Sequence, residues 1–138
     1  METPGRGDPS GETELRASGG QPCVIEKPWG SELLLRLTES YAVKVLRMRA
    51  GCRLSLQYHL VKHETLQLAS GRAILETHAD GQVLRHTMEQ PVAVLPGTVH
   101  RVTALEDCEI LELSSTELDD VVRLEDDYGR VDAAAIRR

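Results

Sequence analysis

The chain has 138 residues, which is the size of one domain. Hydrophobic residues make up 41% of it, but aromatic residues only 3% and there is no Phe, so a packed core has to be built from Leu, Val, Ile and Ala. The formal net charge of −6 argues against nucleic acid or an anionic membrane as a partner, although a local basic cluster could still bind an anionic small molecule.

The cysteines and the apolar runs bear on the cellular compartment. Cys23, Cys52 and Cys108 are widely spaced and form no C-x-x-C pair, which is typical of reduced thiols in a cytosolic protein. No apolar run approaches the ~18 residues of a membrane span, and the N-terminus has no hydrophobic signal region. We therefore expect a cytoplasmic protein.

Residues 1–22 differ in composition from the rest of the chain. They are rich in Gly, Pro, Ser and charge, with almost nothing to bury, so we expect a disordered leader. A single folded domain should then cover residues 23–130. The last residues, 131–138, form a tail that is too short to be a stable helix alone.

From residue 31 onward the hydrophobic pattern is that of β-strands, with Asp80-Gly81 as a hairpin turn. Strands are predicted at 32–37, 41–49, 53–59, 64–69, 72–78, 82–88, 92–95, 100–105 and 108–113. Many short strands with turn signals at this spacing indicate a sandwich or a barrel. The period changes at Ser115, a candidate helix cap. A short C-terminal helix is predicted there, with an apolar face of Leu118, Val121, Val122 and Leu124.

One stretch, residues 53–59, alternates strictly between polar and apolar side chains. Its polar face consists of Arg53, Ser55, Gln57 and His59. If that face points inward, it lines a cavity, and Gln57 and His59 can place an amide oxygen and an imidazole nitrogen on one metal ion. Glu64 from the next strand and His100, after a Pro-Gly turn, would complete the set. The alternative is that these residues face solvent on an edge strand.

Such a mixed nitrogen and oxygen set suits one divalent ion of zinc, iron, manganese or nickel better than calcium. Arg53 would share the cavity face and needs a carboxylate or an anionic ligand, for which phosphate is suited. Lys44 sits on the apolar face of its strand and is a second anion-binding candidate, with an edge-strand lysine as the alternative. His63 is expected in a loop or at a cavity rim, where it could shuttle protons. Arg101 should point away from His100, toward solvent or a partner subunit.

The predicted ligands and the glycines on either side of them resemble the first cupin motif. That motif reads Gly, five residues, His-x-His, four residues, Glu, six residues, Gly. The matching positions are Gly51, Gln57, His59, Glu64 and Gly71, with Gln57 where most cupins have a histidine. Residues 96–100 look like the second motif. Glutamine in that place resembles mannose-6-phosphate isomerases, in particular the small cupin module of the type II enzymes. The stretches Lys27-Pro28-Trp29-Gly30, 53–57 and 121–130 also look like that module, and the resemblance covers about residues 24–130.

The resemblance implies a cupin double-stranded β-helix, or jelly-roll barrel, with a bound zinc ion and aldose–ketose isomerisation of a sugar phosphate. His63 or Lys44 would be the base. The sequence departs from the module at Val61, Thr65, Leu66, Leu95 and Ala104. Two alternatives therefore stay open, namely a metal-dependent lyase, cyclase or dioxygenase of specialised metabolism and a non-catalytic sugar-binding cupin. A homodimer is expected from the exposed sheet edges, with Trp29 in an edge arm at a barrel end or a subunit interface.

Overall fold

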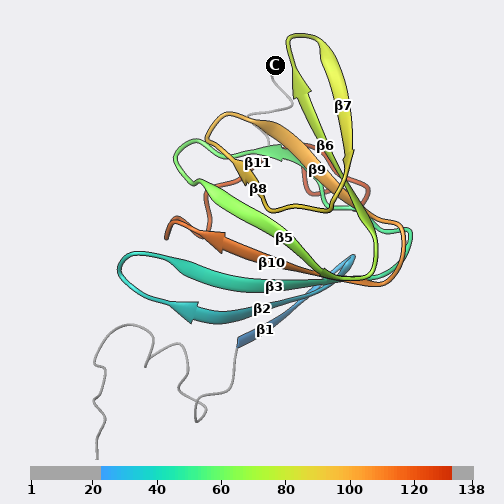
Figure 1. Ribbon diagram of the computed structural model, residues 1–138. Coiled ribbons are helices and arrows are strands. Elements are labelled where there is room, and N and C mark those ends of the chain that lie inside the picture. Colours follow the sequence, from blue (N-terminus) through green and yellow to red (C-terminus); the bar gives the residue numbers. More distant parts are fainter. Residues whose placement is uncertain (1–22, 132–138) are drawn as a thin grey trace, which may run out of the picture.

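The computed structural model describes residues 23–131, so the predicted leader at 1–22 and nearly all of the predicted tail at 131–138 lie outside the described residues. The described chain folds into two antiparallel β-sheets that face each other (Figure 1). This confirms the all-β prediction. Within residues 23–131 the structure has no helix of the length and apolar character needed to cross a membrane.

The two sheets differ in size and share the chain unevenly. Six strands form one sheet, in the spatial order β1 (Cys23–Lys27), β2 (Gly30–Leu37), β3 (Ala42–Met48), β10 (Cys108–Ser114), β5 (Glu64–Ser70) and β8 (Val92–Val94). Five form the other, in the order β11 (Val122–Glu125), β4 (Leu56–Tyr58), β9 (Val99–Ala104), β6 (Ala73–Ala79) and β7 (Gln82–Thr87). Strands far apart in the sequence, such as β3 and β10, are therefore neighbours, as expected of a jelly-roll.

The inward face of the six-stranded sheet is apolar at one end and charged at the other. On β10, buried Ile110 is followed two residues later by buried Glu112, because alternate side chains share a face. The register places Glu112 opposite Lys44 of β3. The apolar end packs against the other sheet and forms the core, which includes Leu46, Met48, Leu66, Leu75, Val102 and Ile110. The charged end cannot be part of that core and lines a cavity instead.

The predicted C-terminal helix is wrong. After β10 the chain makes a series of turns over residues 115–121 and then forms β11. Strand β11 pairs with β4, with Val122 opposite Tyr58 and Arg123 opposite Gln57. Without β11, β4 would present unpaired backbone groups at the edge of its sheet, and pairing satisfies them. Tertiary pairing therefore outweighs the weak helical period of this segment.

The predicted strand at 53–59 is shorter than expected. Only β4 forms regular pairs, while Arg53 makes an isolated bridge to Thr103. The backbone between them is irregular. Alternation along 53–59 is therefore broken, and this decides where the side chain of Arg53 lies.

The glycine that closes the first motif has a steric role. Gly71 follows β5 with a φ of +83°, a conformation that favours glycine. A Cβ at this position would overlap the carbonyl oxygen of Asp107. The turn that leads from β5 into β6 thus requires glycine.

The edges of the sheets are where a partner chain would pair. Strand β7 is an edge strand whose six residues are all exposed, and the predicted homodimer stays a prediction. Trp29, at the β1–β2 turn, is only 4% exposed and packs into the core of its own chain.

Candidate metal centre

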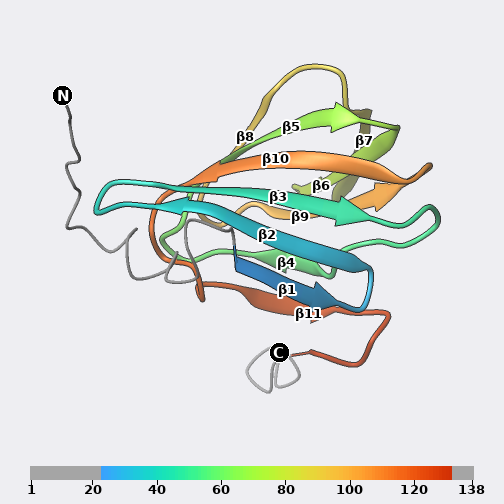
Figure 2. The same cartoon turned by 90° about the horizontal axis from the view of Figure 1, so that it is seen from below.

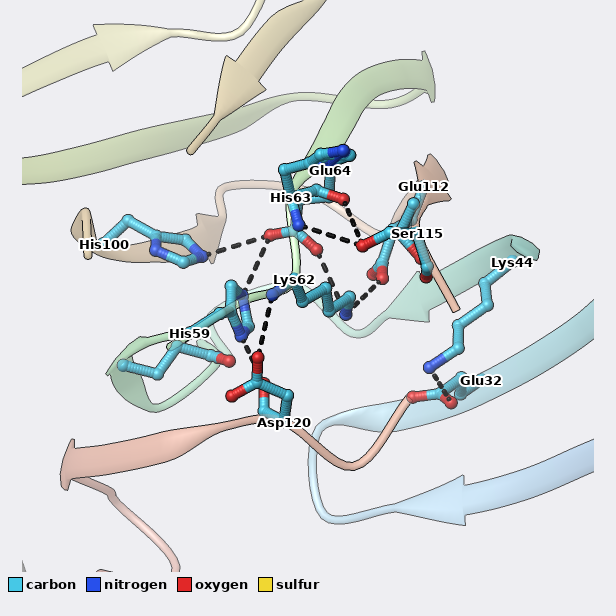
Figure 3. Close-up of polar contacts among 12 residues, drawn as sticks. Glu32, Lys44, His59, Lys62, His63, Glu64, His100, Glu112, Ser115 and Asp120 are labelled. Carbon is cyan, nitrogen blue, oxygen red and sulfur yellow. Dashed lines mark hydrogen bonds and ion pairs between the residues drawn. The ribbon is translucent and has the colours of Figure 1, made fainter. Parts of the chain in front are cut away.

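Three of the predicted metal ligands converge at the charged end of the cavity, which has a volume of about 380 Å³. His59 follows β4, Glu64 begins β5, and His100 lies on β9. The carboxylate oxygen Oε2 of Glu64 lies 3.3 Å from Nε2 of His59 and 3.3 Å from Nε2 of His100 (Figure 3). All three side chains are buried, and their ligand atoms lie within 4.8 Å of one another.

Backbone carbonyls fix the orientation of both imidazole rings. Nδ1 of His59 lies 2.7 Å from the carbonyl oxygen of Asp120, and Nδ1 of His100 lies 2.8 Å from that of Thr98. A carbonyl can only accept, so each Nδ1 carries the proton and donates it. Each neutral ring then presents the lone pair of Nε2 to the centre, which is the arrangement that metal-binding histidines need.

The chemistry of this donor set fits a metal ion. With both Nδ1 atoms protonated, the converging atoms are two imidazole lone pairs and one carboxylate oxygen, which are all acceptors. Three acceptors at these distances repel each other unless a proton or a cation lies among them. His59, Glu64 and His100 could therefore hold a divalent cation, in the nitrogen and oxygen environment that zinc, iron, manganese and nickel accept.

The electrostatics of the metal-free cluster point the same way. When a proton rather than a metal ion lies in the centre, the rings can donate to Glu64. Burial alone would raise the pKa of Glu64, but hydrogen bonds from His100 and His59 and the charge of Lys62 then hold it far below its usual range. Burial would lower the pKa of His59, but its hydrogen bond to Glu64 and the charge of Glu64 raise it. The cluster thus keeps a negative charge that attracts a positive one, either a proton or a metal ion.

Gln57, the fourth predicted ligand, lines the same cavity. It lies on β4 directly opposite His100 of β9. Its Nε2 donates to the carbonyl oxygen of Ser55 at 3.3 Å and to Oγ of Ser55 at 3.2 Å. The amide is thereby held from its nitrogen side, and coordination by its oxygen stays a prediction.

The structure adds a lysine and a glutamate that the sequence reasoning missed. Nζ of Lys62, in the loop before β5, lies 2.8 Å from Oε2 of Glu112 and 3.3 Å from Oε1 of Glu64. Burial would lower the pKa of Lys62, but the two carboxylates raise it, so the ammonium stays charged. Burial, followed by the charge of Glu64, raises the pKa of Glu112. Glu112 could have been found by alternation along its strand, whereas the loop position of Lys62 gives no such signal.

Lys44 and Arg53, the two residues predicted to bind an anion in the cavity, lie in different surroundings. Lys44 is buried, lines the cavity and pairs with Glu32 at 2.8 Å. Its strand β3 lies between β2 and β10, so the alternative of an edge-strand lysine is wrong. Arg53, in contrast, does not line the cavity: its Nε and Nη2 donate to Asp127 at 2.7 and 2.8 Å, and 42% of its side chain is exposed. The broken alternation before β4 turns Arg53 outward, contrary to the prediction.

His63 lies in a loop, which is one of the two expected places, whereas Arg101 lies elsewhere than expected. His63 is exposed and is not part of the cavity lining, so it is a loop residue. Arg101 points away from His100 but not to solvent, because only 2% of it is exposed. Its Nε donates to the carbonyl oxygen of Leu54 at 3.1 Å. Its Nη2 has no hydrogen-bond partner in the part of the chain that the structure describes.

A further residue that was missed, Asp120, organises the loop that carries the ligands. Its carboxylate accepts hydrogen bonds from the backbone N–H groups of Leu60, Val61 and Lys62 at 2.7 to 2.9 Å. The N–H of His63 donates to Oγ of Ser115 at 3.1 Å. We call residues 115–120 the strap and residues 59–64 the ligand loop. The strap holds the ligand loop through its backbone, and no pattern in the sequence reveals such contacts.

Comparison with known proteins places the chain in a family. The family described as "Mannose-6-phosphate isomerase C-terminal" matches residues 17–126. The alginate biosynthesis protein AlgA of Pseudomonas aeruginosa is 32% identical over 131 residues, covering 91% of this chain and 27% of AlgA. Mannose-1-phosphate guanylyltransferase ManC of Salmonella typhimurium is 30% identical over 112 residues, covering 78% of this chain and 23% of ManC. The chain thus spans about a quarter of the length of these relatives.

Solved structures confirm the fold. CapF in complex with the inhibitor 3-isopropenyl-tropolone matches with a TM-score of 0.65 at 18% identity, over 76% of this chain and 35% of CapF. Oxalate decarboxylase from Bacillus subtilis matches with a TM-score of 0.64 at 19% identity, over 86% of this chain and 34% of the decarboxylase. At these identities the likeness shows the fold alone. The chain therefore belongs to the family of mannose-6-phosphate isomerase C-terminal domains and has the cupin double-stranded β-helix fold.

Proposed function

We propose that the protein is a metal-dependent aldose–ketose isomerase that acts on a sugar phosphate of the mannose 6-phosphate type. The observation that supports this most is the convergence of three buried acceptor atoms, from His59, Glu64 and His100, in a polar cavity. Family membership supports the reaction class. The cavity volume of about 380 Å³ is within the usual range for sites that bind small molecules.

His59, Glu64 and His100 would hold the metal ion, with Gln57 as the fourth ligand. Zinc is the ion that we expect from the family resemblance, and the imidazole and oxygen donors of this set accept it. A bound divalent ion polarises a sugar carbonyl or hydroxyl oxygen, which makes the hydrogen on the neighbouring carbon more acidic.

The reaction also needs a base that moves one proton between C1 and C2 of the sugar. The base removes the proton from the carbon beside the carbonyl, which gives an enediol, and the protonated base, which can exchange with solvent, then delivers a proton to the other carbon, so no atom is gained or lost. We assign this role to Glu112, which lines the cavity and is separated from Glu64 only by the Lys62 ammonium. Its raised pKa suits a base better than that of an exposed carboxylate. Nζ of Lys44 is paired with Glu32 at 2.8 Å.

A solvent-exchange experiment tests this function. Metal-loaded protein in D₂O should interconvert mannose 6-phosphate and fructose 6-phosphate and place solvent deuterium on the reacting carbons, as seen by NMR. Glu112→Gln should lower the rate by about 100-fold or more. Glu109→Gln is the matched control, because Glu109 lies on the same strand but pairs with Arg47 on the outer side, with 42% of its side chain exposed.

Two results would contradict the proposal. Wild-type protein that keeps its metal but neither isomerises nor exchanges deuterium would favour a sugar-binding cupin. Equal rates for Glu112→Gln and Glu109→Gln, in a protein that does isomerise, would remove Glu112 from the mechanism and leave the reaction class intact.

A further inference from the structure

The six-stranded sheet has a second face, which points away from the cavity. Figure 2 shows β1, β2, β3, β10 and β5 of this sheet side by side. Val43 and Val45 of β3 alternate with residues of that strand that line the cavity, so their side chains point outward. On β10 the same alternation turns Leu111 and Leu113 outward. The outward side chains at the middle of the sheet are therefore apolar.

The strand register joins these side chains into two rows. The first row crosses four strands and consists of Val24 of β1, Leu33 of β2, Val45 of β3 and Leu111 of β10. The second row consists of Val43 of β3, Leu113 of β10, Thr65 of β5 and Ala93 of β8, with Arg36 of β2 at its other end. We call the apolar patch formed by Val24, Leu33, Val43, Val45, Leu111 and Leu113 the outer face.

In a single copy of the chain the outer face meets solvent. Val24 is 56% exposed and Leu113 is 42% exposed. A sheet with one face in water usually alternates apolar and polar side chains, whereas a strand that is buried on both faces reads as a continuous apolar run. Strand β2 contains such a run, Leu33-Leu34-Leu35. The sequence of this sheet is thus that of a sheet covered on both sides.

The outer side of the sheet is large enough for a stable interface. Six strands of about six residues each, at ~3.3 Å per residue and ~4.8 Å between strands, span roughly 600 Å² before the relief of the side chains is counted. A standard interface buries about 800 Å² of each partner. Exposed apolar patches of several hundred Å² are uncommon in monomers and mark binding surfaces.

The apolar surface that covers the outer face has to come from another molecule. Residues 1–22 and 132–138, which lie outside the described residues, carry three large apolar side chains, namely Met1, Leu15 and Ile136. Three such side chains are too few to match two rows that cross the sheet. A second copy of the chain, in contrast, offers an apolar surface of the same size.

The charges beside the outer face are also compatible with a second copy. The next row toward the β1–β2 turn carries Glu26, Ser31, Arg47 and Glu109. Nε of Arg47 lies 2.9 Å from Oε2 of Glu109, so most of the charge in this row is balanced within one copy. A row that carries both signs can border the same row of a copy without a large repulsion.

We propose that two copies of this chain pack their outer faces against each other about a two-fold axis. An apolar patch is complementary to itself, and a two-fold axis closes the assembly at two copies. Pairing through sheet edges is the alternative, but β8 and β11 are edge strands of three and four residues, and an edge pair buries a strip only one strand wide. Each copy keeps its own metal centre, because the cavity lies on the other side of the sheet.

Size-exclusion chromatography with light scattering, over a concentration series of the full chain, tests the interface. The wild type should have twice the chain mass of 15.3 kDa. Leu113→Lys should weaken dimerisation by about 100-fold or more, because it places two like charges among apolar side chains of the interface. Val83→Lys is the matched control: Val83 is 44% exposed, lies on edge strand β7 of the other sheet, and the substitution changes the charge equally.

A second variant keeps the test independent of the folding of the first. Val24→Lys changes the far end of the outer face, on edge strand β1, and should also give monomers with the circular dichroism spectrum of the wild type. A wild type of 15.3 kDa at every concentration would overturn the proposal. So would a dimer that dissociates in Val83→Lys but persists in Leu113→Lys and Val24→Lys, since that result assigns the interface to the β7 edge.

Discussion

At the scale of single residues, protons and a metal ion compete for the same atoms. Burial lowers the pKa of His59, but Glu64 and the hydrogen bond to the carbonyl of Asp120 together raise it, and the pKa of Glu64 lies far below its usual range. Acidification through the raised pKa of His59 places a proton on Nε2, the atom that a metal needs, while Glu64 stays ionised. We expect metal affinity to fall steadily as the pH drops from about 8 to about 6, a range that begins above the ordinary histidine pKa of about 6.5 because the pKa of His59 is raised.

The stability of the metal-free protein should change with pH in the opposite direction, decreasing as the pH rises. The raised pKa of His59 contributes stability that is fully present below the pKa of the unfolded chain and is lost as pH rises through the folded pKa. Chelator competition gives the metal affinity, and urea unfolding of metal-free protein gives the stability, both across that pH range. A metal affinity that does not change with pH would contradict the assignment of His59 as a ligand.

At the scale of elements, the strap and the ligand loop form one unit. Burial raises the pKa of Asp120, but hydrogen bonds from three consecutive N–H groups of the ligand loop lower it by more, so its carboxylate stays ionised. Asp120→Ala removes all three acceptor contacts. It should cost about 1–3 kcal/mol of unfolding free energy and lower metal affinity by about tenfold, as loss of other supporting contacts does. Thermal unfolding and chelator competition measure the two effects.

The strap prediction has a simple control. Glu89→Ala also removes one negative charge, from an exposed position between β7 and β8, and should leave both quantities unchanged. If Asp120→Ala lowers stability but not metal affinity, the strap supports the fold without positioning the ligands.

The elements also show what the sequence could predict. Strands with clear alternation, such as β3 and β10, were predicted within a residue or two, because one buried face imposes a period of two. The segment that became β11 was misread, because its pairing with β4 is a long-range contact that a local period does not contain. Arg53 was misplaced for a related reason: alternation holds only where the backbone pairs regularly, and next to Arg53 it does not.

At the scale of the whole molecule, the site exists because the inward faces of the two sheets carry charged and polar side chains that an apolar core cannot accommodate. The spacing of the motifs was enough to predict His59, Glu64 and His100 as a group. It could not show that Lys62, Glu112 and Asp120 surround them, since these contacts depend on how β10, the ligand loop and the strap pack together. The spacing of the motifs therefore predicts the ligands, whereas the residues that support them can be identified only from the tertiary structure.

The same geometry links the metal to the stability of the entire fold. The ligands come from the ligand loop before β5 and from β9, so an ion held by them joins the two sheets. An ion that binds only the folded state stabilises it by about 2.7 kcal/mol at a free concentration 100 times its Kd. For a domain of this size, that should raise the melting temperature by about 10 °C or more.

Calorimetry with and without a chelator measures this effect, and the His59→Ala variant identifies its source. In the wild type, chelation should lower the melting temperature, and added zinc should restore it. In His59→Ala the two melting temperatures should coincide, because the lost imidazole is a ligand. An Arg72→Met variant should keep the full difference, since Arg72 is exposed and pairs with Glu106 outside the cavity. The wild-type protein must first be shown to contain metal. If its melting temperature then stays the same when the chelator is added, the ion does not join the sheets at His59, Glu64 and His100.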